Sequence, residues 1–292
     1  MNGHAPGPTE VKTVAVLSHT QPEQTAGAVA LAAELAREAG IELVAGEAEL
    51  SKHSSVEGIG ALEELDGQPD ACLVLGGDGT ILKALRQFAD TDVPVFGINY
   101  GTVGFLAAVD PERLRDGLGL AFSGSFEVMS LPALDAGDGR LALNDVSFHR
   151  RPHGRVAELT FSLGGQDVGH VRCDGLVAAT PAGSTGYNLA NNGPILAWGV
   201  EGFVVSFIAP HTLTARPLVV APDDVLIVRN AAGREAVDLV IDGEHVCDLA
   251  SGDEVEIRFR DDVGRLAQVP GGNFYRRIGE KFGRLTRAET NP

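Results

Sequence analysis

The sequence has little lysine, few cysteines and no long apolar run. Its 40 acidic residues outnumber the 23 lysines and arginines, which gives a formal net charge of −17. This excess argues against nucleic acid or an anionic membrane as the main partner. Any anionic ligand must therefore be held by metal ions, backbone N–H groups and a few local arginines.

The scarce cysteines and the short apolar runs exclude further classes of protein. The three cysteines form no CxxC pair, which argues against a zinc site and a disulfide framework. The most apolar stretch, residues 196–210, is interrupted by Glu201 and is too short to span a membrane. The first ten residues lack the basic start and apolar stretch of a secretory signal. We therefore expect a cytoplasmic protein that has no membrane partner.

The first part of the chain alternates strand and helix patterns. Strands are expected at 11–19, 41–46, 71–77 and 93–99, and helices at 22–40, 80–89 and 110–122. This alternation predicts a doubly wound, Rossmann-like α/β domain over residues 11–125. A helical pattern returns near the end of the chain and predicts a helix at about 273–288 that packs back on this domain.

The second part, residues 126–270, consists of short alternating runs separated by Gly, Asp, Asn and Pro. The runs 140–150 and 168–180 each suggest one strand. Such spacing is typical of a mostly antiparallel β-rich domain.

The segment GGDGT, residues 76–80, follows a buried strand and precedes a helix. Ligands of open α/β sheets bind at this edge, and glycines let backbone N–H groups approach phosphate oxygens. We expect Gly76, Gly77, Gly79 and Thr80 to bind phosphate. The sequence leaves four roles open for Asp78: a metal ligand, a group that positions a hydroxyl, a base, or only a cap of the helix. The segment matches neither a Walker A loop nor GxGxxG.

Three other segments carry polar groups or glycine turns. INYGTVGFLA, residues 98–107, places Asn99 at a second strand end, although an ordinary turn with a packed Phe105 is the alternative. Asn144 and Asp145 suit ribose hydroxyls or an adenine amine, but Asn-Asp is also a common turn pair. The segment 174–194 offers carboxylate, hydroxyl, aromatic and amide groups, which suit a nucleoside better than a polar surface loop.

These segments, in this order, resemble the NAD kinase family. The matching motifs are GGDGT, NYGTVGFL, the pair Asn144–Asp145 and DGLVAATPAGSTGY, and the stretches PHTLTARPLVV and FYRRIGEKFG also look family-like. GGDGT alone is less specific, because phosphofructokinases and lipid kinases share a similar turn. The TPxGSTxY segment discriminates between these families.

The resemblance implies an enzyme that phosphorylates the 2′-hydroxyl of NAD with ATP or polyphosphate and Mg²⁺ or another divalent cation. It implies NAD bound between the two domains, with Asp78 as the base. It also implies homodimers or homotetramers. The residues expected to bind NAD are Gly79, Asn99, Phe105, Asn144, Asp145, Asp174, Thr185, Gly186 and Tyr187.

Three positions depart from the family pattern. Asp145 stands where glutamate is usual, Ala182 replaces a hydroxyl residue, and Gly186 replaces alanine. None of these changes removes the expected base. No metal ligand can be named, because the histidines show no metal-ligand spacing, and we expect turn or surface roles for most of them.

Other functions remain open on the sequence alone. A kinase of the same superfamily acting on a lipid would need an apolar entrance or a basic membrane face. One acting on a sugar phosphate would need basic residues, for which Arg172 and the arginines between 150 and 155 are the candidates. A non-catalytic NAD-sensing module would bind NAD without turnover. A dehydrogenase fits least, since the dinucleotide fingerprint GxGxxG is missing.

Overall fold

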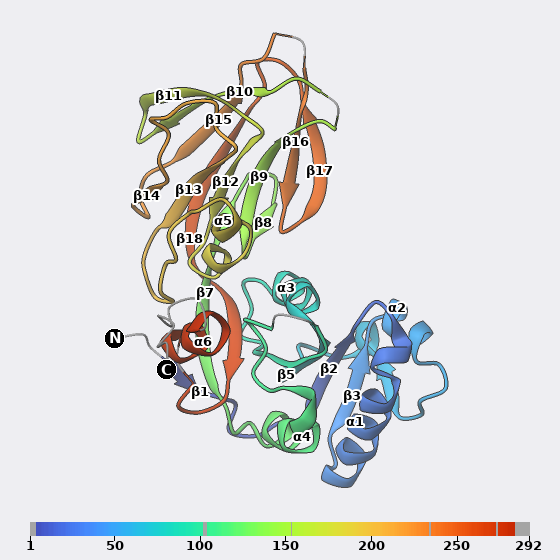
Figure 1. The fold of residues 1–292 in the computed structure, drawn as a ribbon. Coiled ribbons are helices and arrows are strands. Elements are labelled where there is room, and N and C mark those ends of the chain that lie inside the picture. Colours follow the sequence, from blue (N-terminus) through green and yellow to red (C-terminus); the bar gives the residue numbers. More distant parts are fainter. Residues whose placement is uncertain (1–3, 102–103, 153, 234, 273, 284–292) are drawn as a thin grey trace, which may run out of the picture. The chain divides into compact units, whose positions relative to one another are not determined.

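The computed structural model describes residues 4–101, 104–152, 154–233, 235–272 and 274–283. They form two compact units, one of residues 1–130 with 264–292 and the other of residues 131–263 (Figure 1). The strands β7 (Glu127–Asp135) and β18 (Glu254–Gln268) each continue from one unit into the other. No described helix combines the length and the apolar character needed to cross a membrane.

The first unit is built on a parallel sheet. Its strands lie in the order β4 (Ile59–Ala61), β3 (Glu42–Ala45), β2 (Thr13–Ser18), β5 (Ala71–Gly76) and β6 (Val95–Asn99). The chain runs outward from β2 to β4, then returns and continues through β5 and β6. The strand order therefore reverses between β2 and β5, as in doubly wound folds, and this confirms the predicted fold class.

Two further pairings and several helices complete this unit. Leu266 of β18 pairs in parallel with Val95 of β6, and β1 (His4–Pro6) pairs antiparallel with β7. The helices and short 3₁₀ turns are η1 (Pro22–Gln24), α1 (Ala26–Ala39), α2 (Glu47–Lys52), η2 (Leu62–Glu64), α3 (Asp78–Gln87), η3 (Pro111–Arg113), α4 (Leu114–Ser123) and α6 (Phe274–Phe282).

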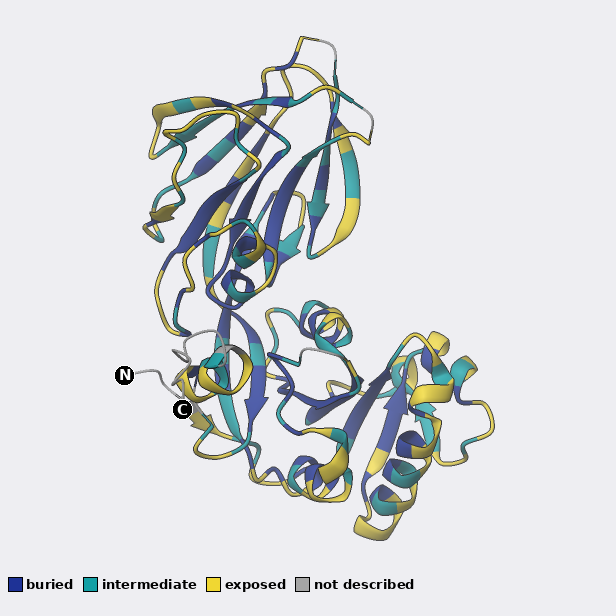
Figure 2. Ribbon diagram, in the orientation of Figure 1, coloured by how far each residue is buried: buried dark blue, intermediate teal, exposed yellow. Residues whose placement is uncertain are grey.

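Burial explains why these elements form. All six residues of β5 are buried, as expected for a central strand covered on both faces (Figure 2). The helices α1 and α4 bury apolar residues such as Val29 and Leu118 in one shared core. On β6, a Cβ at Gly97 would lie 2.5 Å from Cδ1 of Ile81, so glycine lets α3 pack closely on the sheet.

The helix boundaries differ slightly from the predicted ones. The predicted helix 22–40 is divided by Thr25 into η1 and α1, and that at 110–122 begins with a 3₁₀ turn. The helix after GGDGT begins at Asp78, two residues earlier than predicted. The predicted C-terminal helix extends over Asn273 and residues 284–288, which lie outside the described residues.

The second unit contains two antiparallel sheets. One has six strands in the order β14 (Leu218–Val220), β13 (Phe203–Ile208), β12 (Gly175–Ala179), β9 (Asp145–Arg150), β16 (Val237–Ile241) and β17 (Glu244–Leu249). The other contains β11 (Gln166–Cys173), β10 (Ala157–Leu163), β15 (Leu226–Asn230) and the first part of β18. A common core that includes Phe148, Leu159 and Leu239 joins them, which confirms the predicted β-rich fold.

Two predicted strands are interrupted. The run 140–150 consists of β8 (Leu141–Ala142) and β9, and the run 168–180 is divided between β11 and β12, which lie in different sheets. The chain changes sheet at Asp174, whose N–H donates to the carbonyl of Ile208. The link from β12 to β13 includes η4 (Gly183–Thr185) and α5 (Tyr187–Ala190).

Candidate active site

The GGDGT turn places the side chain of Asp78 against the loop that follows β6. Its Oδ2 accepts the N–H of Phe105 at 2.8 Å, and its Oδ1 accepts the N–H of Leu106 at 3.0 Å. The N-cap of α3 is Gly77 and Asp78 is the first residue of the helix, so Asp78 is not the capping residue. Asp78 is half-buried, and its carboxylate is held in one orientation by two backbone donors.

The glycines of this turn allow a close approach to the neighbouring turn. A Cβ at Gly77 would lie 3.1 Å from Cα of Gly101, and the N–H of Tyr100 donates to the carbonyl of Gly76 at 3.0 Å. The turns after β5 and β6 therefore form one rim at the carboxyl edge of the sheet. Gly79 is exposed, with open space where a Cβ would lie.

Asn99 and Phe105 are built into this rim. Asn99 is buried, and its Oδ1 accepts the N–H of Gly101 at 3.0 Å. The ring of Phe105 is also buried and meets Phe274 of α6 edge-on, with ring centroids 6.0 Å apart. The packed position of Phe105 matches the alternative interpretation of its segment, while its backbone contacts Asp78.

The carbonyl groups of residues 105–107 accept hydrogen bonds from side chains of β18 and α6. Arg277 donates from Nη1 to the carbonyls of Phe105 and Ala107, both at 2.7 Å. Gln268 donates from Nε2 to the carbonyl of Leu106 at 3.3 Å and accepts a bond from Arg277. Sequence spacing gave no signal for these contacts, because Arg277 lies 172 residues after Phe105.

In the second unit, one aspartate organises the pair Asn144–Asp145. The carboxylate of Asp242 accepts the N–H groups of Leu143, Asn144 and Asp145 at 3.0, 2.7 and 3.0 Å. Asp242 lies in the turn between β16 and β17 with a φ of 46°, a left-handed conformation that aspartate tolerates. Sequence analysis missed this residue, whose only local signal is the turn pair Asp-Gly.

Asp145 itself is buried and receives no hydrogen bond at its carboxylate from the described residues. Burial and, to a smaller extent, the nearby negative charge of Asp242 together raise the pKa of Asp145 to about 7. The neighbouring Asn144 has a buried Oδ1 that finds no partner among the described residues. This pair therefore offers unsatisfied polar groups to a ligand.

The segment after β12 is a packed structure rather than a surface loop. Thr180, Ser184 and Asn188 are fully buried. The hydroxyl of Thr180 donates to the carbonyl of Leu143 at 2.6 Å, and that of Thr185 donates to the carbonyl of Ala182 at 3.0 Å. The surface-loop alternative is thus wrong for these residues.

Tyr187 and Asp174 lie at the exposed side of this segment. The ring of Tyr187 is 37% exposed and stacks on His149, with centroids 5.5 Å apart and planes at 17°. Burial raises the pKa of Tyr187, and the charges of Asp145 and Asp174 raise it further. These carboxylates are therefore near the phenol.

Two further residues beside this cluster have contacts that the sequence did not predict, although Arg150 was among the candidate arginines for a sugar phosphate. Nε of Arg150 lies 2.6 Å from Oδ1 of Asp174, which gives Asp174 a fixed cationic partner. His149, for which a turn or surface role was expected, is half-buried, and burial lowers its pKa. Its position in β9 opposite Gly175 was not predictable without the strand pairing.

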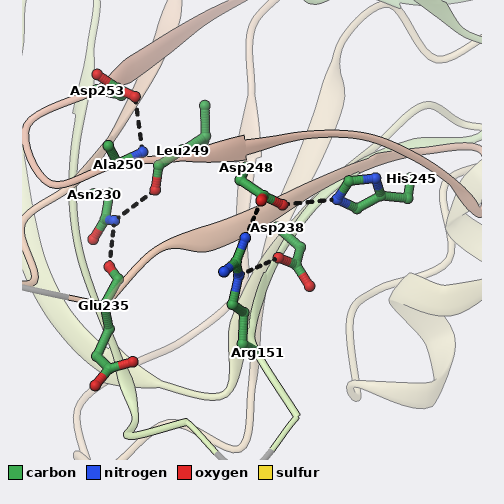
Figure 3. A network of polar contacts seen from close by, with 9 residues as sticks. All are labelled: Arg151, Asn230, Glu235, Asp238, His245, Asp248, Leu249, Ala250 and Asp253. Carbon is green, nitrogen blue, oxygen red and sulfur yellow. Dashed lines mark hydrogen bonds and ion pairs between the residues drawn. The ribbon is translucent and has the colours of Figure 1, made fainter.

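Among the described residues, one group could approach a metal ion: Asp238, His245 and Asp248. Figure 3 shows that Arg151 already contacts both carboxylates, with Nε 3.2 Å from Oδ1 of Asp238. His245 lies 3.1 Å from Asp248. Hydrogen bonds from Arg151 and His245 lower the pKa of Asp248. The group is therefore an ion-pair network in which Arg151 already neutralises the two carboxylates.

Comparison with known proteins gives matches over both units. The model of the ATP-NAD kinase N-terminal domain matches residues 29–125, and that of the ATP-NAD kinase C-terminal domain matches residues 143–263. The NAD kinase of Rhodopirellula baltica is 37% identical over 226 residues, 75% of this chain and 73% of its own length. That of Aromatoleum aromaticum is 34% identical over 281 residues, 93% of each chain.

Two solved structures have similar folds. The crystal structure of yeast NADH kinase complexed with NADH superposes with a TM-score of 0.83, at 22% identity, over 97% of this chain and 90% of that one. An NAD kinase from Archaeoglobus fulgidus in complex with ATP gives a TM-score of 0.72 at 26% identity, over 94% and 98% of the two chains.

Proposed function

This chain belongs to the NAD kinase family, and on that premise we propose that it transfers the γ-phosphoryl group of ATP to the 2′-hydroxyl of the adenosine ribose of NAD, giving NADP. Inorganic polyphosphate is the alternative donor. One observation carries the proposal: Asp78 follows a glycine turn at the strand-order reversal, and two backbone donors fix its carboxylate. The solved relative that binds ATP supports a nucleotide donor.

We assign Asp78 as the base that accepts the proton of the 2′-hydroxyl. Each of its carboxylate oxygens has two acceptor sites and uses one for a backbone N–H. A second site on each oxygen is left to receive a hydroxyl proton. Because a carboxylate is a weak base toward an alcohol, its main contribution is orientation of the hydroxyl, with proton transfer late in the reaction.

Phosphate binding is assigned to the turn itself, through Gly76, Gly77, Gly79 and Thr80. The first N–H groups of a helix lack the usual helical partner, although that of Thr80 donates to the carbonyl of Gly77 at 2.9 Å, and the helix N-terminus favours negative charge. The exposed Gly79 leaves room for a phosphate beside α3. Such local donors would hold an anion in spite of the net charge of −17.

A divalent cation fits this site only together with the phosphates. At the turn, Asp78 supplies a carboxylate, while the acidic group in the second unit is paired with Arg151. Mg²⁺ is commonly held by one or two carboxylates plus substrate phosphates, so Asp78 is the protein group that would complete its shell. When bound, Mg²⁺ would neutralise phosphate charge.

NAD recognition is assigned to the second unit through Asn144, Asp145, Asp174, Thr185, Gly186 and Tyr187, and to Asn99 and Phe105 of the first unit. The buried, unpartnered Oδ1 of Asn144 supports a role as an acceptor for ligand N–H or O–H groups. The partly exposed ring of Tyr187 can cover a planar base. Exposed Gly186 leaves space beside it.

The finer assignments of domains, location and assembly stay predictions. We propose that residues 11–125, with the C-terminal helix, bind the phosphate donor, and that residues 126–270 bind NAD. A cytoplasmic location is proposed from the composition of the chain, and a homodimer or homotetramer from the family resemblance. Size-exclusion chromatography with light scattering would measure the assembly.

A direct assay tests the proposed reaction. The purified protein is incubated with Mg²⁺, with NAD or NADH, and with ATP or polyphosphate, and an NADP-specific dehydrogenase reports the product. We expect product with NAD and ATP. Loss of product with an NAD analogue that lacks only the 2′-hydroxyl of its adenosine ribose would confirm the acceptor atom. Failure of every donor and acceptor pair would refute the proposal and favour a non-catalytic NAD-binding protein.

A further inference from the structure

Residues 105–107 are held from both sides by side chains of the first unit. On one side, Asp78 accepts the N–H groups of Phe105 and Leu106. On the other side, Arg277 donates to the carbonyls of Phe105 and Ala107, and Gln268 donates to that of Leu106. All three carbonyls of the segment therefore have a side-chain donor, and two of its N–H groups have the same carboxylate acceptor.

One peptide group lies between the charged side chains of Arg277 and Asp78. The carbonyl of Phe105 and the N–H of Leu106 belong to the same planar amide. Arg277 donates to that carbonyl at 2.7 Å, and Asp78 accepts from that N–H at 3.0 Å. A cation on the oxygen polarises the amide and strengthens the bond from its N–H to the carboxylate. Arg277 thus acts on Asp78 through one amide.

The electrostatics of Arg277 agree with this connection. Burial lowers the pKa of Arg277, and the negative charge of Asp78 acts in the opposite direction. A guanidinium nevertheless stays protonated in proteins, and its rigid planar group can contact two carbonyls at once. The Arg277 guanidinium also donates to Oε1 of Gln268, which fixes it relative to β18.

We propose that Arg277 and Gln268 are positioning residues for Asp78, which hold the backbone of residues 105–107 so that its N–H groups fix the catalytic carboxylate. This rests on the proposed function, in which Asp78 is the base. The C-terminal helix α6 then contributes to the chemistry without touching the substrate. Its apolar contact, Phe274 against Phe105, fixes the helix but does not orient the amide.

The test compares Arg277→Met, Arg277→Lys and Gln268→Leu with a matched control, Arg276→Met. Arg276 is the adjacent residue of α6, is exposed, and pairs with Glu280 at 2.9 Å. Each protein is assayed for kcat, for KM of NAD and for thermal melting. Hydrogen exchange of the Phe105 and Leu106 amides is measured by NMR.

We expect Arg277→Met to lower kcat by roughly 10- to 100-fold, the effect of a misplaced catalytic group, with KM of NAD unchanged within about twofold. The Leu106 amide should exchange faster, by about tenfold or more, because its bond to Asp78 is weakened. Arg277→Lys should recover part of the loss, because one ammonium can still donate to a carbonyl. Arg276→Met should leave kcat and both amides unchanged.

Other outcomes would overturn the inference. Wild-type kcat with a lower melting temperature in Arg277→Met would make Arg277 only an anchor for α6. If that variant is unfolded at the assay temperature, Gln268→Leu decides, since it removes the bond to Leu106 and leaves the Phe105–Phe274 contact in place. A normal kcat in folded Gln268→Leu would then contradict the proposal.

Asp78→Asn separates this inference from the proposed function. If Asp78→Asn keeps full activity, the base assignment fails, whatever Arg277 does. If Asp78→Asn is inactive and Arg277→Met has normal kcat and normal amide exchange, only the positioning role fails. In the Asp78→Asn background, Arg277→Met should cause no further loss of kcat, because coupled residues are not additive.

Discussion

Asp78 in the α/β unit and Asp145 in the β-rich unit both lie at the junction of a turn and a regular element, yet their surroundings are opposite. Two backbone N–H groups bond to the carboxylate of Asp78. No described residue bonds to the carboxylate of Asp145, which is buried and has a pKa raised to about 7. The placement of backbone donors, rather than residue type, therefore decides whether a carboxylate is held in one orientation.

The difference has an identifiable cause in Asp242. The N–H groups of Leu143, Asn144 and Asp145 all point to the carboxylate of Asp242. They are therefore not available to Asp145, whose pKa is raised first by burial and then by the neighbouring charge of Asp242. Asp242 therefore accepts backbone N–H groups and holds that part of the β-rich unit in place. Asp78 accepts backbone N–H groups and is also the proposed base.

The largest expected effect comes from Asp78→Asn. Removal of the base should lower kcat by roughly 10²- to 10⁴-fold, while NAD binding stays measurable by calorimetry. The matched control is Asp70→Asn, because the carboxylate of Asp70 also accepts two backbone N–H groups, from Lys12 and Thr13. The control should lose stability but keep its kcat. Equal kcat in the two variants would show that Asp78 is only an anchor.

The next largest effect is expected from Asp242→Ala. Loss of three charge-assisted hydrogen bonds should lower the free energy of unfolding by about 2–4 kcal/mol and weaken NAD binding, because Asn144 and Asp145 are no longer held. Asp242→Asn should lose less, since asparagine tolerates the positive φ and keeps one acceptor oxygen. Chemical denaturation and calorimetry measure both effects.

Asp253→Asn is the control for Asp242. Asp253 lies in another turn of the same unit and accepts a single N–H, that of Ala250, at 2.8 Å (Figure 3). We expect little change in NAD binding. Weakened binding in Asp253→Asn to the same degree as in Asp242→Ala would contradict the specific role of Asp242.

A smaller effect is expected from the ring of Tyr187. Tyr187→Ala should raise KM of NAD by about 3- to 10-fold, the usual value of one aromatic contact, with little change in kcat. Tyr187→Phe should keep most of the affinity. Tyr275→Ala, which removes a ring that is 73% exposed on α6, serves as the control. A fall in kcat alone would argue against a binding role for Tyr187.

A separate prediction concerns the dependence of stability on pH. The folded pKa of Asp145 is raised above its unfolded value, so stability falls as the pH rises from about 4 to about 7, because the unfolded state releases this proton while the folded state retains it. Asp145→Asn removes this loss and should raise the melting temperature more at pH 8 than at pH 5, by roughly 2–4 °C for each kcal/mol. An increase in melting temperature that is the same at pH 5 and at pH 8 would contradict the raised pKa of Asp145.

The sequence predicted the local parts of this arrangement better than the distant ones. Buried strand patterns and glycine turns located Asp78 and the pair Asn144–Asp145, because turn chemistry depends on neighbouring residues. Contacts across long separations left no such pattern. Asp242 lies 98 residues after Asn144, and Arg277 lies 172 residues after Phe105. The sequence favoured a nucleoside site over a surface loop for residues 174–194, but polar composition gave no sign that Thr180 and Ser184 are fully buried.

The most direct test of the account is a crystal structure of Asp78→Asn with NAD and a non-hydrolysable ATP analogue. We expect the 2′-oxygen of the adenosine ribose to lie within about 3 Å of the residue 78 side chain. We also expect this side chain to keep its contact with the Leu106 amide. A ribose bound far from residue 78, or a different hydroxyl facing it, would contradict the role assigned to Asp78.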